Sequence, residues 1–249
     1  MKLSANYTYK VMVPAHLDSI RLVEKVLVDI KGKAMLLRVL ERCAQAVGRE
    51  NVCVVTPDRK IEDAVSGWGF DVYLSSPDLP DGSSAIASVA PSVEVDYIVN
   101  VQGDQPLVPP ELIQALIKNL AASGADMVTP VFRITELEDL GEKGVAKVTR
   151  DLDGWALYFS RSPIPYIRDI PYEKWLETVP FWGHYGIYGY PRKTLLNLGK
   201  LKHSYLESGE KLEQLRLLQN GLKVFTFETP HRQLAVDTQE DLEKILKYL

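Results

Sequence analysis

Tyr97-Ile98-Val99-Asn100-Val101-Gln102-Gly103-Asp104-Gln105-Pro106 joins a short apolar run, rich in β-branched residues, to a polar turn. Continuous rather than alternating apolarity is typical of a strand that is buried on both faces of a parallel sheet. Gly103 permits a tight turn after that strand, and Asp104 would project an acceptor-only carboxylate beyond its carboxyl end. Ligands of open α/β sheets bind at these strand ends. The stretch therefore predicts an α/β sheet with a polar binding site after residue 101.

Similar strands and helices flank this stretch. Val11-Met12-Val13 and Val52-Cys53-Val54-Val55 are further apolar runs that predict strands. Apolar residues recur at i, i+3, i+4 and i+7 from Leu36 to Cys43 and from Leu242 to Leu249, which predicts two helices. Pro109-Pro110 predicts the start of a third helix, whose apolar face is Leu112, Ile113, Leu116, Ile117 and Leu120. Strand–helix–strand alternation predicts a doubly wound sheet with right-handed crossovers.

The rhythm changes in the second half of the chain, from about Val145 onward. Residues 155–159 and 187–190 predict strands that long helices no longer separate, and the Pro- and aromatic-rich segment between Ser162 and Pro180 predicts a long ordered loop. We expect one domain over residues 1–249. Within it, residues from about 145 to 205 form an elaborated region that covers the site or makes a dimer contact.

Composition excludes several classes of protein. The 249 residues include 29 Lys plus Arg and 33 Asp plus Glu, so the net charge of −4 argues against a general nucleic-acid binder. No apolar run approaches the roughly 18–20 residues of a membrane span, and the polar N-terminus predicts no signal region. Cys43 and Cys53 are too few for a disulfide scaffold or a zinc site, so we expect both in the core. A soluble, cytoplasmic α/β protein is expected.

Three polar turns carry the candidate site residues. Pro14 to Leu22 follows the first predicted strand and leads to Lys25, Gln102 to Pro106 follows the strand described above, and Val236 to Asp241 precedes the last helix. Two carboxylates at strand ends, Asp104 and Asp237, can hold Mg²⁺, which prefers one or two protein carboxylates plus substrate phosphates. Lys25 and Arg21 can hold those phosphates. The residues alone therefore suggest Mg²⁺-dependent chemistry on a nucleotide.

Each turn also has a purely structural interpretation. Thr238 with Asp241 fits a helix capping box that Asp237 merely precedes, and Asp104 before Gln-Pro fits a turn former. The two cations of the first turn fit an ordinary solvated surface. By spacing alone these alternatives stay open.

From Val11 to about Leu246 the chain resembles the 3-deoxy-manno-octulosonate (Kdo) cytidylyltransferases, also called CMP-Kdo synthetases. Five blocks carry the resemblance, in the family's order and spacing. They are Val99-Asn-Val-Gln-Gly-Asp-Gln-Pro106, Trp155-Ala-Leu-Tyr-Phe-Ser-Arg-Ser-Pro-Ile-Pro165, His184-Tyr-Gly-Ile-Tyr-Gly-Tyr190, Lys211-Leu-Glu-Gln-Leu-Arg216 and Val236-Asp-Thr-Gln-Glu-Asp-Leu242.

The resemblance implies a fold, a reaction and a set of site residues. The fold is a three-layer, doubly wound mixed sheet of the nucleotidyltransferase, Rossmann-like type, with an inserted β/loop dimerisation region. The reaction joins the anomeric hydroxyl of Kdo to the α-phosphate of CTP and releases pyrophosphate, without a covalent enzyme intermediate. Mg²⁺ is the implied cofactor, held by Asp104 and Asp237, while Lys25 and Arg21 grip the triphosphate. A homodimer in lipopolysaccharide or other Kdo-glycan synthesis is also implied.

Two sets of binding residues follow from the same resemblance. The nucleotide-binding set is Pro14, Ala15, His16, Arg21, Lys25, Gly82, Ser83, Gln102 and Asp104. The sugar-binding set is Gln102, Arg161, His184, Tyr188, Glu213 and Gln214. Structural alternatives remain here too: Glu213 fits an i, i+3 surface pair with Arg216, Tyr188 a core position, and His184 a structural role.

The chain departs from the family pattern at the nucleotide. His16 stands where the family has Arg, and Glu24 adds a negative charge beside Lys25. The family's Ser-Gly-Thr-Asp/Glu-Arg reads Asp81-Gly82-Ser83-Ser84-Ala85 here, so a second Arg is missing. Loss of two charge-assisted hydrogen bonds without replacement weakens binding by roughly 10²–10⁴-fold. A different sugar acid or nucleotide, or a weakly active or non-catalytic nucleotide-binding relative, is therefore the alternative function.

Overall fold

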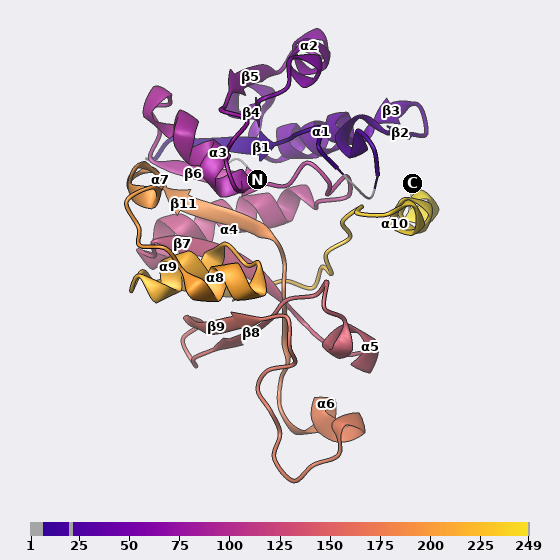
Figure 1. Ribbon diagram of the computed structural model, residues 1–249, viewed down its shortest axis with the longest axis vertical. Helices are drawn as coiled ribbons and strands as arrows, with labels where there is room; N and C mark the ends of the chain where they lie inside the picture. The colour runs from indigo at the N-terminus through magenta and orange to yellow at the C-terminus, as the bar shows by residue number, and fades with distance from the viewer. Residues whose placement is uncertain (1–6, 20–21, 249) are drawn as a thin grey trace.

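The computed structural model describes residues 7–19 and 22–248 (Figure 1). Within these residues, ten strands form one mixed sheet in the order β5-β4-β1-β6-β11-β7-β10-β8-β9, with β12 paired to β7. The strands of this sheet are β1 (Tyr9–Pro14), β4 (Val52–Thr56), β5 (Asp71–Leu74), β6 (Tyr97–Val101), β7 (Met127–Arg133), β8 (Lys147–Arg150), β9 (Ala156–Ser160), β10 (Trp182–His184), β11 (Ile187–Pro191) and β12 (Val224–Glu228). A small separate hairpin consists of β2 (Asp29–Ile30) and β3 (Lys33–Ala34).

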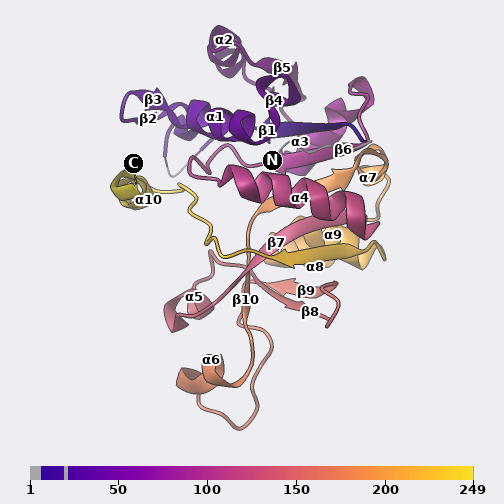
Figure 2. The ribbon, with the colours of Figure 1, turned by 180° about the vertical axis from the view of Figure 1, so that it is seen from behind.

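Helices cover both faces of the sheet, which gives the expected three layers. They are α1 (Met35–Val47), α2 (Arg59–Gly67), α3 (Gly82–Val89), α4 (Pro110–Ser123), α5 (Leu137–Gly141), α6 (Trp175–Thr178), α7 (Arg192–Leu198), α8 (Tyr205–Glu210), α9 (Gln214–Gln219) and α10 (Gln239–Ile245). Helices α1 and α4 lie on one face, and α3, α7, α8 and α9 lie on the other (Figures 1 and 2).

Alternate residues of the central strands supply the two cores. Val11 and Val13 of β1 pack into the core beneath α1 and α4, whereas Met12 packs into the core beneath α3 and α7. In β4, Val54 and Cys53 divide in the same way. Because both faces are covered, the central positions of these strands, Val11 to Val13 and Val52 to Val55, are all apolar. This confirms the prediction of strands buried on both faces, and Cys43 and Cys53 are confirmed as buried free thiols.

The chain reverses its direction across the sheet between β1 and β6. It runs outward from β1 to β4 and β5, all parallel, and then returns to place β6 on the other side of β1. Strand β11 then pairs antiparallel with β6, which makes the sheet mixed. In doubly wound sheets, a crevice opens beyond the strand ends at such a reversal. The turns that follow Pro14 and Val101 meet there.

The elaborated second half continues the same sheet. Strands β8, β9, β10 and β11 all come from residues 145–205, and the expected strands at 155–159 and 187–190 correspond to β9 and β11. The predicted loop from Ser162 to Pro180 is largely irregular, but it contains a 3₁₀ turn (Tyr172–Lys174) and the short helix α6. This segment extends away from the rest of the molecule (Figures 1 and 2).

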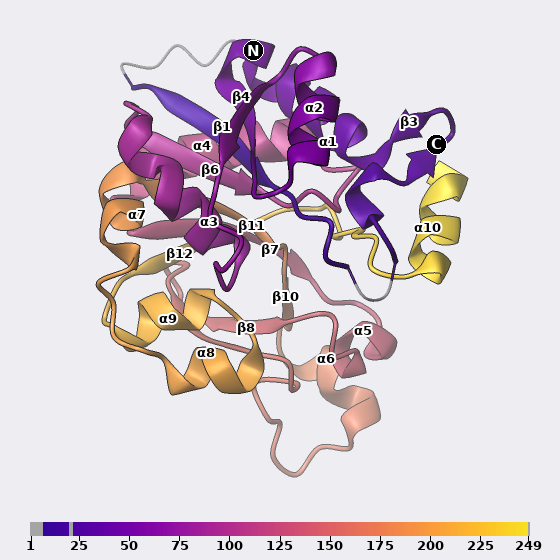
Figure 3. The same ribbon diagram turned by 45° about the horizontal axis from the view of Figure 1, so that its top comes forward.

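The C-terminal helix is shorter than its apolar pattern predicts. Helix α10 ends at Ile245, and a 3₁₀ turn continues to Tyr248, while Leu249 lies outside the described residues. The helix packs beside the β2–β3 hairpin (Figure 3), where Leu242 and Ile245 meet Ile30 and Met35. The predicted capping box of Thr238 and Asp241 is present. Across the described part of the chain, no helix combines the length and apolarity that crossing a membrane requires.

Candidate active site

A cavity of about 410 Å³ opens at the reversal between β1 and β6. The turn after β1, the turn after β6, the start of α3 and the segment before α10 all contribute to it. Its lining is Pro14, Ala15, His16, Asp18, Ser19, Lys25, Val26, Gly82, Gln102, Gly103, Asp104 and Asp237. The cavity therefore lies where the sequence places its polar turns.

Lys25 joins the two predicted carboxylates of the cavity. Its Nζ lies 2.8 Å from Asp104 Oδ2 and 2.8 Å from Asp237 Oδ1. Burial alone lowers the pKa of Lys25, but the two carboxylates outweigh it, so the net shift is upward and the amine stays charged. A backbone hydrogen bond of 2.9 Å from Val236 N to Asp104 O holds the two carboxylate segments together. Asp104 and Asp237 thus converge on a single cation.

Most of the predicted nucleotide-binding residues surround this cavity. Pro14, Ala15, His16, Lys25, Gly82, Gln102 and Asp104 all line it. Arg21 lies outside the described residues. The glycine at 82 is required by a close approach, because a Cβ there would lie 2.9 Å from Pro14 Cγ. Ser83 does not line the cavity; it is buried behind it.

Ser83 connects the nucleotide side to the predicted sugar side. Its Oγ lies 3.0 Å from the Tyr190 hydroxyl and accepts from Asn100 Nδ2 at 3.3 Å. Gln102 Nε2 donates to Asn100 Oδ1 at 3.2 Å, and the Ser83 amide donates to Glu213 Oε2 at 3.3 Å. Gln102 is the member of the sugar-binding set that lines the cavity. The other members do not line it, and of these Glu213 is joined to Gln102 through this network.

His184 and Tyr188 are buried together, with ring centroids 5.5 Å apart. Burial lowers the pKa of His184 to about 3, so its ring is neutral. Its Nε2 lies 2.8 Å from Thr129 Oγ1, and that hydroxyl donates its single proton to Ile187 O at 2.8 Å. The same hydroxyl lies 3.2 Å from Tyr185 O, so Thr129 ties the neutral ring of His184 to the backbone between β10 and β11.

Gln214 and Arg161 differ in how far their hydrogen-bonding groups are engaged. Gln214 is fully buried, and within the described structure its Oε1 and Nε2 have no hydrogen-bond partner. The Arg161 guanidinium donates to three backbone carbonyls: Glu210 O at 2.7 Å, Lys143 O at 2.8 Å and Lys211 O at 3.1 Å. Buried amides normally have partners, so Gln214 is suited to a ligand. Arg161 fixes the turn that precedes Glu213.

Glu213 is the member of the set with the most altered acidity. Burial, and next the neighbouring Asp81 carboxylate, raise its pKa to about 8. The pKa of Tyr188, raised mainly by burial, is further raised by the charge of Glu213 and lowered by that of Arg161, so these three side chains lie near one another. At pH 7 Glu213 is therefore mostly a neutral carboxylic acid that can donate a hydrogen bond.

Three departures from the family pattern lie among the described residues. Glu24 does not leave an unmatched charge beside Lys25, because both its carboxylate oxygens lie 2.6 Å from Lys60 Nζ. His16 is exposed at the cavity rim, and Ala85 is partly buried in α3. Neither of these two positions supplies a guanidinium group to the cavity.

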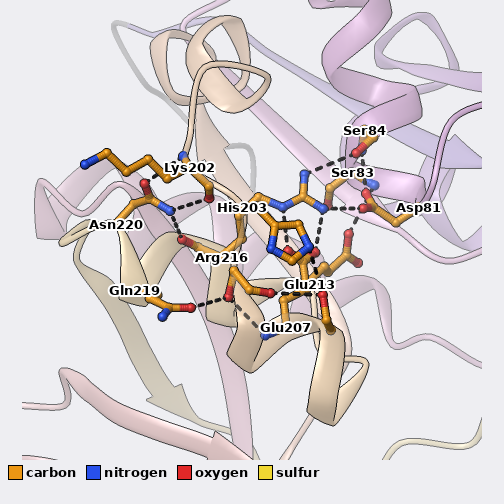
Figure 4. Close-up of polar contacts among 12 residues, drawn as sticks. Asp81, Ser83, Ser84, Lys202, His203, Glu207, Glu213, Arg216, Gln219 and Asn220 are labelled. Carbon is orange, nitrogen blue, oxygen red and sulfur yellow. Dashed lines mark hydrogen bonds and ion pairs between the residues drawn. The ribbon is translucent and has the colours of Figure 1, made fainter.

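Sequence reasoning missed the role of Arg216. The surface pair of Arg216 with Glu213 is wrong, since its guanidinium pairs with Asp81 and Glu207 instead (Figure 4). Asp81 also accepts from the Ser84 amide at 2.7 Å and so caps α3. An Asp three residues before Ser84 at a helix start is a recognisable capping signal. The distant contact with Arg216 leaves no local signal.

Comparison with known proteins agrees with this geometry. A family model described as cytidylyltransferase matches residues 10–224. A curated relative, the 3-deoxy-manno-octulosonate cytidylyltransferase of Geobacter sulfurreducens, is 42% identical over 248 residues, which cover 96% of this chain and 98% of that protein. The chain belongs to the 3-deoxy-manno-octulosonate cytidylyltransferase family.

Solved structures extend the likeness to three dimensions. The structure of CMP:2-keto-3-deoxy-manno-octonic acid synthetase complexed with CTP aligns with a TM-score of 0.89 and 34% identity, covering 97% of this chain and 98% of that one. A glucose-1-phosphate thymidylyltransferase from Bacillus anthracis aligns with a TM-score of 0.68 at 14% identity, which shows a shared fold. This cytidylyltransferase therefore has the nucleotidyltransferase fold that the sequence predicts.

Proposed function

We propose that this cytidylyltransferase transfers CMP from CTP to the anomeric hydroxyl of Kdo, or of a closely related 3-deoxy-ulosonic acid, and releases pyrophosphate. The observation that carries the proposal is the convergence of Asp104 and Asp237 on Lys25 in the cavity at the sheet reversal. An ammonium between two carboxylates leaves one net negative charge. A divalent cation there reverses that sign and favours a triphosphate.

Mg²⁺ is the cation that this donor set suits. Among the described residues no group of three His, Cys, Asp or Glu is arranged to hold a metal, and the carboxylates that the cavity brings together on Lys25 are Asp104 and Asp237. Mg²⁺ is bound in this way, by one or two carboxylates with water and substrate phosphates as its other ligands. Bound to Asp104 and Asp237, it would lower the pKa of the attacking hydroxyl and offset charge at phosphorus.

The chain's own residues position the two substrates. Lys25, freed from the carboxylates by a metal ion, would pair with the triphosphate, and Gly82 leaves room for the nucleotide against Pro14. Catalysis then rests on positioning and electrostatics, without a covalent enzyme intermediate. Arg21 belongs to the phosphate grip in this proposal.

The buried side chains behind the cavity suit a polar sugar acid. Gln214 offers an unpaired amide, His184 a neutral imidazole ring, and Glu213 a neutral carboxyl donor. Arg161, through its two N–H groups beyond the three carbonyl contacts, is the partner for the carboxylate of the acid. Tyr188 and Gln102 complete the set.

A homodimer is proposed through the second half of the chain. Leu157 of the edge strand β9 and Leu152 in the turn before it are exposed, as is Tyr166 in the segment with α6. Exposed apolar side chains on an edge strand favour association. Light scattering should give the mass of a dimer, and Leu157→Lys should yield a monomer. A wild-type monomer at micromolar concentration contradicts this part of the proposal.

The cell compartment and pathway are proposed from chemistry. Two buried free thiols suit a reducing, cytoplasmic compartment. The product, an activated sugar acid, would supply the synthesis of lipopolysaccharide or another Kdo-containing glycan.

Pyrophosphate release by the purified protein tests the proposed function. The assay contains CTP, Kdo and Mg²⁺, and each component is omitted in turn; release should require all three. A panel of nucleotides and 3-deoxy-ulosonic acids then identifies the preferred pair. Nucleotide binding without turnover on any acid contradicts the proposal and favours a non-catalytic relative, which the absence of Arg at positions 16 and 85 would explain.

A further inference from the structure

Three charged side chains join residues 81–85, called the nucleotide loop below, to the corner between α8 and α9 (Figure 4). Arg216 Nη2 lies 2.6 Å from Asp81 Oδ2 and 2.5 Å from Glu207 Oε1, and its Nε donates to Glu207 Oε2 at 2.8 Å. Each of the three side chains is less than 20% exposed. Pairs this well shielded from water are stronger than surface pairs, so the three act as a unit.

Asp81 anchors the nucleotide side of this unit. One carboxylate oxygen caps α3 through the Ser84 amide, while the other binds Arg216. The next residue, Gly82, lines the nucleotide cavity and closely approaches Pro14. A displacement of Asp81 therefore moves a cavity wall.

Arg216 and Glu207 anchor the sugar side. Glu207 belongs to α8, and Arg216 lies one helical turn beyond Glu213 in α9. The bend between the helices is tight, with Lys211 at a φ of 54°. Gln214 opens α9 directly after this bend. Whatever holds Arg216 therefore also fixes where Glu213 and Gln214 point.

We propose that Asp81 is a positioning residue for the sugar acid: through Arg216 it holds the α8–α9 corner, with Glu213 and Gln214, against the nucleotide loop. This inference rests on the proposed function, because it takes that corner as part of the sugar site. Asp81 would hold this corner through the charge of its carboxylate, in addition to capping α3.

The variant Asp81→Ser keeps the helix cap and removes the carboxylate charge that acts on both Arg216 and Glu213. Serine caps a helix about as well as aspartate, so α3 keeps its cap while Arg216 loses a carboxylate. We expect the KM for the sugar acid to rise about tenfold, as for one lost charge-assisted hydrogen bond, and the KM for CTP to change by less than about threefold.

A relocated carboxylate provides the rescue. Ser84 Oγ lies 3.3 Å from Arg216 Nη1, so Ser84→Glu brings a carboxylate within reach of the same guanidinium. The double variant Asp81→Ser with Ser84→Glu should restore the KM for the sugar acid to within about threefold of wild type. If the ion pair were merely structural, Asp81→Ser would lower thermal stability but would not raise the KM for the sugar acid more than the KM for CTP. The double variant would then have no KM change to restore.

Two further variants serve as a control and as an independent test of the Arg216 contacts. Glu228→Gln removes the charge that Glu228 contributes to its pair with Arg150, which does not line the nucleotide cavity, and it should leave both KM values unchanged. Glu207→Gln leaves the Asp81 cap intact and weakens the other side of Arg216. It should raise the KM for the acid in the same direction, and it replaces Asp81→Ser if that variant does not fold.

Hydrogen–deuterium exchange separates failure of this inference from failure of the proposed function. Asp81→Ser should speed amide exchange over residues 211–216, and the double variant should slow it again, whether or not turnover is seen. Wild-type silence in the pyrophosphate assay refutes the function alone. Unchanged exchange in Asp81→Ser, or unchanged KM for the acid in an active enzyme, overturns the positioning role.

Discussion

Lys25 carries one positive charge between Asp104 and Asp237, and under the proposed function this balance would let the cavity bind a cation first and a polyanion second. Two carboxylates and one ammonium sum to −1, which attracts a divalent ion. With that ion bound, the same group carries +1 and favours a triphosphate. The Lys25 side chain is 13% exposed, so its charge is shielded from solvent, whereas the Asp237 side chain is 41% exposed.

Lys25→Met should therefore change two affinities in opposite directions. Loss of the ammonium should tighten Mg²⁺ binding to the free protein, because −1 becomes −2, and should weaken CTP binding by about ten- to hundredfold. Calorimetric titration with each ligand measures both. Lys33→Met, which removes an exposed pair with Glu41, serves as the control. A variant that binds Mg²⁺ more weakly would contradict the assigned charge balance.

His184 should make the fold sensitive to acid. Burial holds its folded pKa near 3, below the ordinary 6.5 of an unfolded histidine. The unfolded chain therefore takes up a proton as the pH falls through 6.5, while the folded one does not. Stability is lost between about pH 6.5 and 3. Denaturant unfolding across this range should show a shallower pH dependence for His184→Gln than for wild type; parallel curves would refute the assignment.

Glu213 should set an alkaline limit for sugar-acid binding. Its pKa is raised to about 8, first by burial and then by Asp81, so the neutral donor present at pH 7 becomes an anion above pH 8. Tyr188, Tyr190 and Asp81 face the same group. An anionic Glu213 repels an anionic substrate, so KM for the acid should rise through pH 8. Glu213→Gln should flatten that rise; a profile identical to wild type would contradict it.

At the scale of elements, the apolar pattern of the sequence predicted the central strands, which are buried on both faces of the sheet. Strands β1, β4 and β6 were predictable because helices cover both faces and their central positions are mostly apolar. Helix α4 was predictable from its two prolines and apolar stripe. Strand β12 (Val224–Glu228) is not among the predicted strands, and its place in the sheet depends on pairing with β7, almost 100 residues earlier.

The close approach of α3 to β1 gives a test at this scale. A Cβ on Gly82 would lie 2.9 Å from Pro14 Cγ, so Gly82→Ala must push the first turn of α3 away from the end of β1. We expect KM for CTP to rise about tenfold, with a smaller loss of stability. Steady-state kinetics and thermal unfolding check both, and Gly67→Ala, which meets no atom within 4 Å, is the matched control. An unaltered KM for CTP would place the nucleotide elsewhere.

At the scale of the whole molecule, the reversal between β1 and β6 brings together residues that the chain keeps far apart. Lys25 and Asp237 are 212 positions apart, yet they are in direct contact. Their presence in polar turns was visible in the sequence, but the expectation that Asp237 stands at a strand end is wrong, because β12 ends at Glu228 and no strand lies between Glu228 and Asp237. Their mutual distance was not visible, since it depends on how the segment before α10 crosses back to Asp104. The family resemblance supplied that link.

The same limit explains the errors in the site. Arg216 was interpreted from its own helix, where Glu213 is one turn away, whereas its partners come from α3 and α8. Helix spacing identifies neighbours on one helix and carries no information about a loop that packs on it from 135 positions earlier. Only the assembled sheet places Asp81 against that guanidinium.

The measurement that tests the central claim most directly is pyrophosphate release by Asp104→Asn and Asp237→Asn beside Asp71→Asn. Each of these three variants removes one carboxylate that pairs with a lysine. Asp71 lies on the edge strand β5, where it pairs with Lys10 of β1. With CTP, Kdo and Mg²⁺ present, both cavity variants should lose at least about 10²–10³-fold in turnover while remaining folded, and Asp71→Asn should match wild type. Full activity in either cavity variant would contradict the account.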